Sequence, residues 1–156
     1  MIYVLNHDGQ SLMPTDRCWR ARHLLKERKA KVVKRCPFTI QLLYQNTNYT
    51  QPISLGVDAG SKYIGMSATT ETKEVYASEI ELRNDIVKLL SDRRALRRGR
   101  RSRKTRYRKP RFQNRKRGEK WLVPSIQHKI QTHLDATEAV CKILPITRIT
   151  ETEDRK

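Results

Sequence analysis

A dense run of arginine and lysine between residues 93 and 120 restricts what this chain can fold into more than any other feature. Sixteen basic side chains there face one acid, Glu119, so the segment holds +15 of the chain's net charge of +18. A helix over 93–111 would carry cations on every face, and like charges four residues apart destabilise a helix by roughly a few tenths of a kcal/mol per pair. We therefore expect a long arginine-rich helix at 93–120 that is stable only beside a polyanion.

The preference for arginine over lysine indicates which polyanion this is. A guanidinium binds two phosphate oxygens at once and stacks on bases, which an ammonium cannot do. Aromatic side chains, among them Trp121, lie between the cations and are able to stack on exposed bases. The alternative for such a run is a solvated tail or a nuclear-localisation signal. The predicted nucleic-acid-binding residues are Arg93, Arg94, Arg97, Arg98, Arg100, Arg101, Arg103, Lys104, Arg106, Tyr107, Arg108 and Arg111.

The rest of the composition argues against several other classes of protein. Residues 51–92 carry a net charge of −3 and 121–156 are neutral, as in ordinary globular sequence, whereas 1–50 carry +6. No apolar run approaches the roughly 20 residues that cross a bilayer, and residues 1–10 lack the pattern of a secretory signal. The three cysteines are widely spaced, which argues against a zinc site or a disulfide framework. We expect a cytoplasmic protein with no membrane partner.

Residues 1–50 are predicted to form a small β-rich module. An apolar strand comes first, and Pro14-Thr15-Asp16 then suits the start of a helix, with Thr15 or Asp16 as its N-cap. The helix is amphipathic and basic, and two β-branched runs follow it as further strands. The basic side of this helix has two possible interpretations: it is a solvated surface, or it is a surface that contacts phosphates.

Residues 51–92 contain the candidate catalytic residue. From Ile53 to Asp58 apolar and polar side chains alternate with the period of a half-buried strand. We expect a turn at Gly60 with a positive φ, after which Tyr63 begins the second strand of a hairpin. Asp58 then lies at a strand end, where a carboxylate can bind Mg²⁺ together with waters and phosphate oxygens. The alternative is that Asp58 only accepts backbone N–H bonds in the turn.

Two helices are predicted farther along the chain. Asn84 or Asp85 is suited to cap the first helix, which leads into the arginine-rich segment. Residues 124–144 repeat apolar side chains at intervals of three and four, which predicts the second helix, with Ser125 as its N-cap. A final strand is expected at 146–150.

Five stretches carry a resemblance to a known family. They are 11–15 (SLMPT), 22–43 (RHLLKERKAKVVKRCPFTIQLL), 56–62 (GVDAGSK), 93–111 and 121–149. In this order they resemble the IscB proteins, transposon-encoded RNA-guided DNA endonucleases, although Ser11 replaces the family's first proline.

The resemblance implies an α+β or α/β fold in four parts. A module named for its P-L-M-P motif occupies 1–50, and the first part of an RNase H-like (RuvC) nuclease occupies 51–92. An arginine-rich bridge helix at 93–120 splits that nuclease fold, and an incomplete second RuvC part occupies 121–156. The bridge helix would grip a structured guide RNA and its heteroduplex with target DNA by backbone and shape, in a prokaryotic, nucleoid-associated cytoplasmic setting.

The resemblance also implies a metal site. Asp58 becomes the first catalytic and Mg²⁺-binding carboxylate. In the family a glutamate follows three residues after the apolar residue matched by Ile149, but this chain has Thr152 there. Glu151 is the candidate second catalytic carboxylate, although a shift of one position turns a side chain to the opposite face of a strand. Glu151, or Glu153 on the other side of Thr152, would therefore serve only if the strand slipped by one residue.

Three functions stay open at this point. The family continues into an HNH nuclease and a third RuvC segment, and neither falls within these 156 residues. The chain is therefore the nucleic-acid-binding N-terminal part of an RNA-guided endonuclease with its remainder on another chain, an inactive RNA-binding relic, or a basic ribosome- or nucleoid-associated protein. Because a two-metal site needs carboxylates from several segments, we expect no cleavage by this chain alone.

Overall fold

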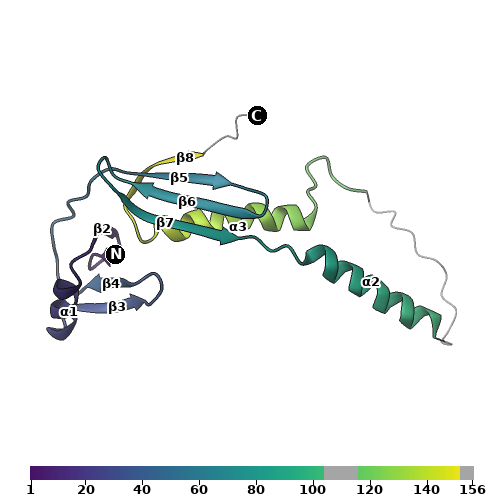
Figure 1. Ribbon diagram of the computed structural model, residues 1–156, viewed down its shortest axis with the longest axis horizontal. Coiled ribbons are helices and arrows are strands. Elements are labelled where there is room, and N and C mark those ends of the chain that lie inside the picture. The colour runs from purple at the N-terminus through teal and green to yellow at the C-terminus, as the bar shows by residue number, and fades with distance from the viewer. Residues whose placement is uncertain (104–115, 152–156) are drawn as a thin grey trace.

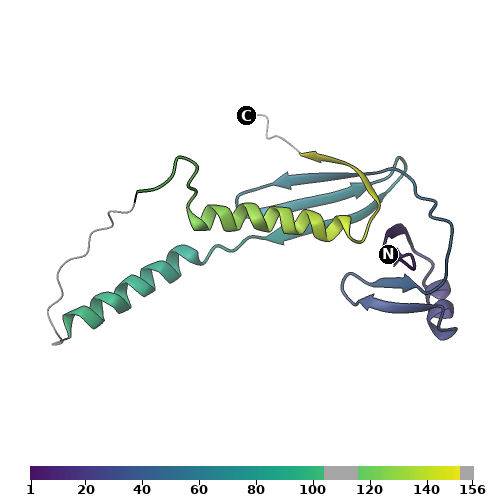
Figure 2. The same cartoon turned by 180° about the vertical axis from the view of Figure 1, so that it is seen from behind.

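A computed structural model describes residues 1–103 and 116–151 of the chain. Two four-stranded sheets and three helices make up this part, in a mixed α and β arrangement (Figure 1). The first sheet lies at one end of an elongated molecule, and helix α2 extends from the other end (Figures 1 and 2). None of the described helices is long and apolar enough to span a bilayer.

The N-terminal sheet has the strand order β2-β1-β4-β3, and helix α1 (Cys18–Lys26) packs on it. Strands β1 and β4 are parallel, whereas β2 and β3 pair antiparallel at the two edges. A small core of Ile2, Leu12, Ala21, Ile40 and Leu42 joins the helix to the sheet, because these side chains alternate toward it along their strands. The expected β-rich module is therefore present. Its strands are β1 (Ile2–Leu5), β2 (Ser11–Thr15), β3 (Ala30–Lys34) and β4 (Thr39–Leu42).

The predicted helix start at Pro14 is wrong, because Pro14 belongs to strand β2. Proline cannot donate a ladder hydrogen bond, and the edge position of β2 tolerates this loss. Helix α1 begins two residues later than Asp16 and has Arg17 at its N-cap without a side-chain capping bond. The Thr15 hydroxyl instead accepts a hydrogen bond from the Arg17 N–H at 3.2 Å, just before the helix.

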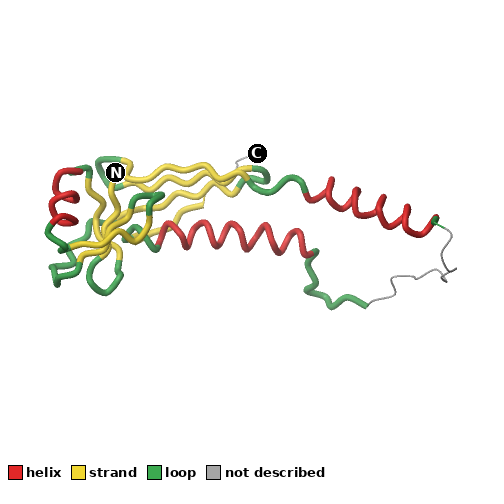
Figure 3. The backbone as a smooth tube through the Cα atoms, turned by 90° about the horizontal axis from the view of Figure 1, so that it is seen from below, coloured by secondary structure: helices red, strands yellow, loops and turns green. Residues whose placement is uncertain are grey.

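The second sheet, here called the central sheet, has the strand order β7-β6-β5-β8. Strands β5 (Ile53–Ala59), β6 (Tyr63–Thr69) and β7 (Glu74–Glu81) form an antiparallel meander, which confirms the predicted hairpin. Strand β8 (Ile146–Glu151) pairs parallel to β5. Parallel neighbours need a long crossover, and helix α3 (Pro124–Cys141) supplies it across one face of the sheet (Figures 1 and 3).

The core lies between the central sheet and α3. Ile53 and Leu55 on β5 are fully buried and share one core with Val140 on the helix and Leu144 just after it. The intervening side chains of β5, including Asp58, point to the opposite face, as the alternating pattern predicted. This opposite face of the central sheet is called the open face below. Helix α3 starts at Pro124 with Val123 as N-cap, so the expected cap at Ser125 is wrong by two residues; proline is favoured at N1.

Tyr3 joins the two sheets. Its hydroxyl, carried by β1, donates a hydrogen bond to the Val75 carbonyl at 3.3 Å, and its ring meets the Tyr76 ring edge-on with centroids 6.2 Å apart. Burial, and then the neighbouring Tyr76, raise the pKa of Tyr3. An ion pair between Lys73 and Asp16 at 3.0 Å joins the same two parts at the surface.

Helix α2 (Ile86–Ser102) follows β7 after a short connection. Asp85 occupies the N-cap position, as predicted, but its side chain does not cap the helix. Its carboxylate instead accepts a hydrogen bond from Arg83 at 2.6 Å, which lowers the pKa of Asp85. The helix ends at Ser102, and residues 116–120 are not helical, so a single helix over 93–120 is wrong in its bounds.

Candidate nucleic-acid interface and acidic sheet face

Six of the predicted arginines lie on helix α2. At about 100° per residue, they fall within roughly 160° of the helix circumference instead of on every face. The opposite side carries Asp92, Ala95, Leu96 and Gly99. The expectation of cations on all faces is therefore wrong for this helix. We call the six residues the arginine face: Arg93, Arg94, Arg97, Arg98, Arg100 and Arg101.

Nothing within the described residues neutralises the arginine face. The ion pairs of this part of the chain lie elsewhere, and none includes any of its six guanidinium groups. Neighbours such as Arg93 and Arg97, or Arg97 and Arg101, are four residues apart and repel each other. A row of guanidinium groups on one side of a helix presents donors of the kind that bind phosphate oxygens through two parallel hydrogen bonds.

Helix α2 also lacks a packing partner among residues 1–103 and 116–151. None of its 17 residues is buried, and even Val87 and Leu96 are 79% and 68% exposed. Most helices in proteins are stabilised by packing an apolar face, and α2 has no such contact in the described part of the chain. The helix is about 26 Å long, and the arginine face occupies roughly 12 Å of this length, from Arg93 to Arg101.

The remaining members of the predicted set divide into two groups. Arg103 follows the helix at its C-cap in an extended conformation, and its N–H donates to the Gly99 carbonyl. The others lie outside the described residues: Lys104, Arg106, Tyr107, Arg108 and Arg111. Trp121, expected to stack on bases, is 42% exposed and has the Arg117 guanidinium 3.9 Å from its ring centroid. The cation–π contact thus occupies one face of the indole.

Asp58 lies on the open face near the end of β5, exposed to solvent. Its register partner on β6 is Gly65, and the partner of Gly65 on β7 is Glu79. A Cβ on Gly65 would lie 3.9 Å from Asp58 Oδ2, so the glycine leaves the carboxylate uncovered. Sequence reasoning did not identify Gly65 or Glu79, although counting the hairpin register across the turn would have paired Asp58 with Gly65.

The surface around Asp58 is concave. A depression of about 640 Å³ is lined by side chains or backbone of Gly56, Asp58, Tyr63, Ser67 and Glu79. Strands β5 and β7 run in the same direction, so Asp58 lies at the end of the sheet from which α2 emerges (Figure 1). The fold thereby brings Asp58 to the end of the central sheet from which the arginine-bearing helix starts.

The turn after Asp58 differs from the prediction in one respect. Gly60 does not have a positive φ; among the described glycines only Gly9 does. A Cβ at position 60 would instead lie 2.5 Å from the carbonyl oxygen of Tyr63. Glycine is required here by space, because the chain folds back so tightly that backbone occupies the place of a side chain.

Glu151 does not meet Asp58. It ends strand β8 in register with Val57, so its side chain shares the face of buried Val57 and points away from the open face. Thr152, at the position of the family's glutamate, lies outside the described residues. Within residues 1–103 and 116–151, no three His, Cys, Asp or Glu side chains gather as a metal site.

Comparison with known proteins gives one family. The sequence matches the family described as RRXRR protein over residues 2–155, nearly its whole length. No curated protein matches it.

Proposed function

Since this chain belongs to the RRXRR protein family, we propose that it binds nucleic acid as the N-terminal part of an IscB-like RNA-guided DNA endonuclease. The arginine face of α2 lies along the backbone of a structured guide RNA and of its heteroduplex with target DNA. Recognition is by charge and shape, and the sequence of the target is read by the guide RNA.

The arginine face is the observation that carries this proposal. It has six guanidinium groups on one side of a helix with no buried residue and no acidic partner among the described residues. Phosphates are the ligands that suit this arrangement, because each guanidinium can donate two parallel hydrogen bonds to phosphate oxygens. Each such contact also releases counterions from the nucleic acid. The strand order β7-β6-β5-β8, with β8 parallel to β5, supports the RuvC part of the proposal.

The acidic residues support only part of an Mg²⁺ site. Asp58 fits the role of one oxygen ligand, because it is exposed on the open face beside a glycine. Glu151 does not fit as the second ligand, because it shares the face of Val57. Mg²⁺ would supply charge neutralisation at a scissile phosphate, but the described residues do not complete a site for it, and we derive no cleavage step.

The register between β5 and β8, which pairs Glu151 with Val57, also favours a second candidate function. If no other carboxylate joins Asp58, the chain is an RNA-binding relic that keeps the arginine face and lacks catalysis. Both functions require the same binding surface and differ only at the open face. The third possibility, a basic ribosome- or nucleoid-associated protein, leaves the Asp58–Gly65 arrangement without a role.

The test of binding uses salt. Affinity for a structured RNA, measured by fluorescence anisotropy between 50 and 300 mM salt, should give a log–log slope of several units, because each phosphate contact contributes roughly 0.7–0.9. Changing Arg97, Arg98, Arg100 and Arg101 together to Gln should lower this slope by roughly three units. The effect should be similar for RNAs of unrelated sequence, because backbone contacts carry no sequence information.

A charge-matched control separates the arginine face from net charge. Changing Lys62, Lys129, Lys142 and Arg148 to Gln removes the same charge from the body of the molecule and should change the slope by less than one unit. An unmodified chain with a slope near one would refute the phosphate-contact proposal. Equal losses in the two variants would show that net charge, and not the helix, drives binding.

A further inference from the structure

A pocket in the N-terminal module lies outside the surfaces described so far. It is formed where α1, the N-terminal sheet and the connection after β4 meet, and it encloses about 230 Å³. This is smaller than the roughly 300–1,000 Å³ of pockets that hold a drug-sized ligand, so it suits a single flat ring system. The lining includes apolar Met13, Leu24 and Leu42, and Tyr44, Thr47 and Tyr49 from the connection.

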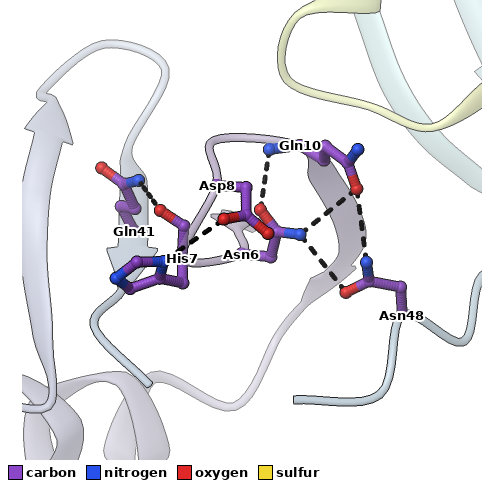
Figure 4. A network of polar contacts seen from close by, with 6 residues as sticks. All are labelled: Asn6, His7, Asp8, Gln10, Gln41 and Asn48. Carbon is purple, nitrogen blue, oxygen red and sulfur yellow. Dashed lines mark hydrogen bonds and ion pairs between the residues drawn. The ribbon is translucent and has the colours of Figure 1, made fainter. Parts of the chain in front are cut away.

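A network of side-chain amides holds the connection in place (Figure 4). Asn6, which is 3% exposed, donates to Gln10 Oε1 at 3.3 Å and to Asn48 Oδ1 at 3.4 Å. Asn48 in turn donates to Gln10 Oε1 at 3.3 Å. Asn48 lies between Thr47 and Tyr49, so the network fixes the pocket wall against the β1–β2 loop. A wall held in advance loses less entropy when a ligand binds.

The lining offers groups that recognise an unstacked base. Tyr44 and Tyr49 are 41% and 81% exposed, so their rings are open to a stacking partner. Asn46 and Thr47 also line the pocket, and none of the hydrogen bonds of the described residues engages their side chains. Aromatic rings with free amide and hydroxyl groups are the means by which proteins bind splayed-out bases of RNA.

The charge around the pocket selects a polyanionic ligand. Between residues 17 and 35 the chain has nine Lys or Arg and one acid, Glu27. Glu27 pairs with Lys29 at 3.0 Å, and the other eight cations of this stretch have no acidic partner among the described residues. Arg20 is exposed and lines the pocket itself. An apolar peptide would gain nothing from this surface, whereas a nucleic-acid strand places phosphates beside each base.

We propose that this pocket receives one unstacked base of an unpaired RNA nucleotide, with Tyr44 and Tyr49 against the ring and the basic residues of α1 against the adjoining phosphates. The proposal rests on the proposed function, since it assumes an RNA ligand, and adds a second contact of a different kind. The arginine face holds the backbone of helical RNA, and the pocket selects an unpaired base.

The test compares two strands that differ only in their bases. A dye-labelled 12-nucleotide single-stranded RNA and an abasic strand of the same length are titrated with the full chain at fixed salt. Base–aromatic stacking predicts roughly fivefold or greater preference for the intact strand. Tyr44→Ala with Tyr49→Ala, and separately Thr47→Trp, which fills the pocket, should abolish this preference while both strands still bind. Trp19→Ala is the control, because Trp19 is an exposed aromatic residue of α1 that does not line the pocket.

The outcomes separate the two proposals. If both strands bind with a steep salt dependence and equal affinity, the proposal of a base-binding pocket is overturned and the proposed function still stands. The pocket proposal is also overturned if the preference for the intact strand survives both pocket variants or is lost in Trp19→Ala. A preference that appears only with a DNA strand overturns it as well. A dimer that dissociates in the tyrosine variant would show that a second copy fills the pocket. Absence of any RNA binding would refute the proposed function and the pocket together. Crosslinking of 4-thiouridine RNA to residues 44–49 would support the pocket directly.

Discussion

Gly60 and Gly65 show how two glycines on one hairpin meet different needs. At Gly60 a methyl group has no room, because the Tyr63 carbonyl oxygen would lie 2.5 Å away. At Gly65 there is room, and a side chain would meet Asp58 at ordinary contact distance. The first glycine is thus a requirement of the fold, and the second keeps a carboxylate accessible.

Gly60→Ala should destabilise the chain by roughly 1–3 kcal/mol, because backbone must shift to admit the new methyl group. The measurement is urea unfolding followed by circular dichroism. Gly99→Ala is the matched control: it lies on exposed α2 with nothing within 4 Å of the added Cβ. Alanine is the better helix former there by up to roughly 1 kcal/mol, so stability should stay equal or rise. Equal losses in the two variants would contradict the crowding at Gly60.

Helices α2 and α3 have nearly the same length but opposite relations to the core. Helix α3 buries Ala136 and Val140 against the central sheet, whereas α2 buries nothing. A helix without packing depends on local propensity alone, and repulsion along the arginine face works against it. Stability should therefore differ sharply between the two helices in the free protein.

Amide hydrogen exchange should detect this difference. In the free chain we expect the amides of α2 from Leu90 to Ser102 to exchange within roughly tenfold of unfolded-peptide rates, and those of α3 around Val140 to be protected far more strongly. Adding structured RNA should slow exchange in α2, because phosphates neutralise the arginine face. Strong protection of α2 without RNA would show that the helix has a partner within the chain.

At the scale of the whole molecule, the basic helices and the candidate metal-binding residue Asp58 lie in different places. Helices α1 and α2 lie toward opposite ends of the elongated chain, with the central sheet between them (Figures 1 and 2). Both helices carry several basic side chains, whereas the open face of the central sheet carries Asp58. Many residues therefore support the proposed binding, whereas among residues 1–103 and 116–151 Asp58 has no second carboxylate that converges with it as a metal ligand.

We expect that the purified chain does not nick supercoiled plasmid in the presence of Mg²⁺ and RNA. Two metal ions about 3.5–4 Å apart need several carboxylates between them, and Glu151 points away from Asp58. The assay compares the unmodified chain with Asp58→Ala, and both should leave the plasmid intact. Cutting that disappears in Asp58→Ala would show that further ligands reach the site, for example from a second copy.

Much of this protein was determined by its sequence alone. The arginine-rich segment, the β-rich module, the hairpin at Asp58 and the helix-then-strand ending depend on local pattern, and each is visible in periodicity or charge. The family followed from motifs in fixed order, and the match over residues 2–155 confirms it at the level of RRXRR protein. The N-caps were less predictable, because Thr15, Asp85 and Ser125 have side chains suited to capping but none of them caps its helix. Thr15 and Asp85 instead accept hydrogen bonds from Arg17 and Arg83.

Only the tertiary structure decided which residues meet. Strand β8 pairs with β5 across more than 80 residues, and its register alone sets the face of Glu151; a shift of one residue would reverse it. The end of α2 at Ser102 decided that the arginines form one face, since a longer helix would have spread them around the axis. The pocket by Tyr44 and Tyr49 comes from a connection without periodicity, which is held by three side-chain amides from two separate segments. Such contacts depend on positions in space, which local pattern does not encode.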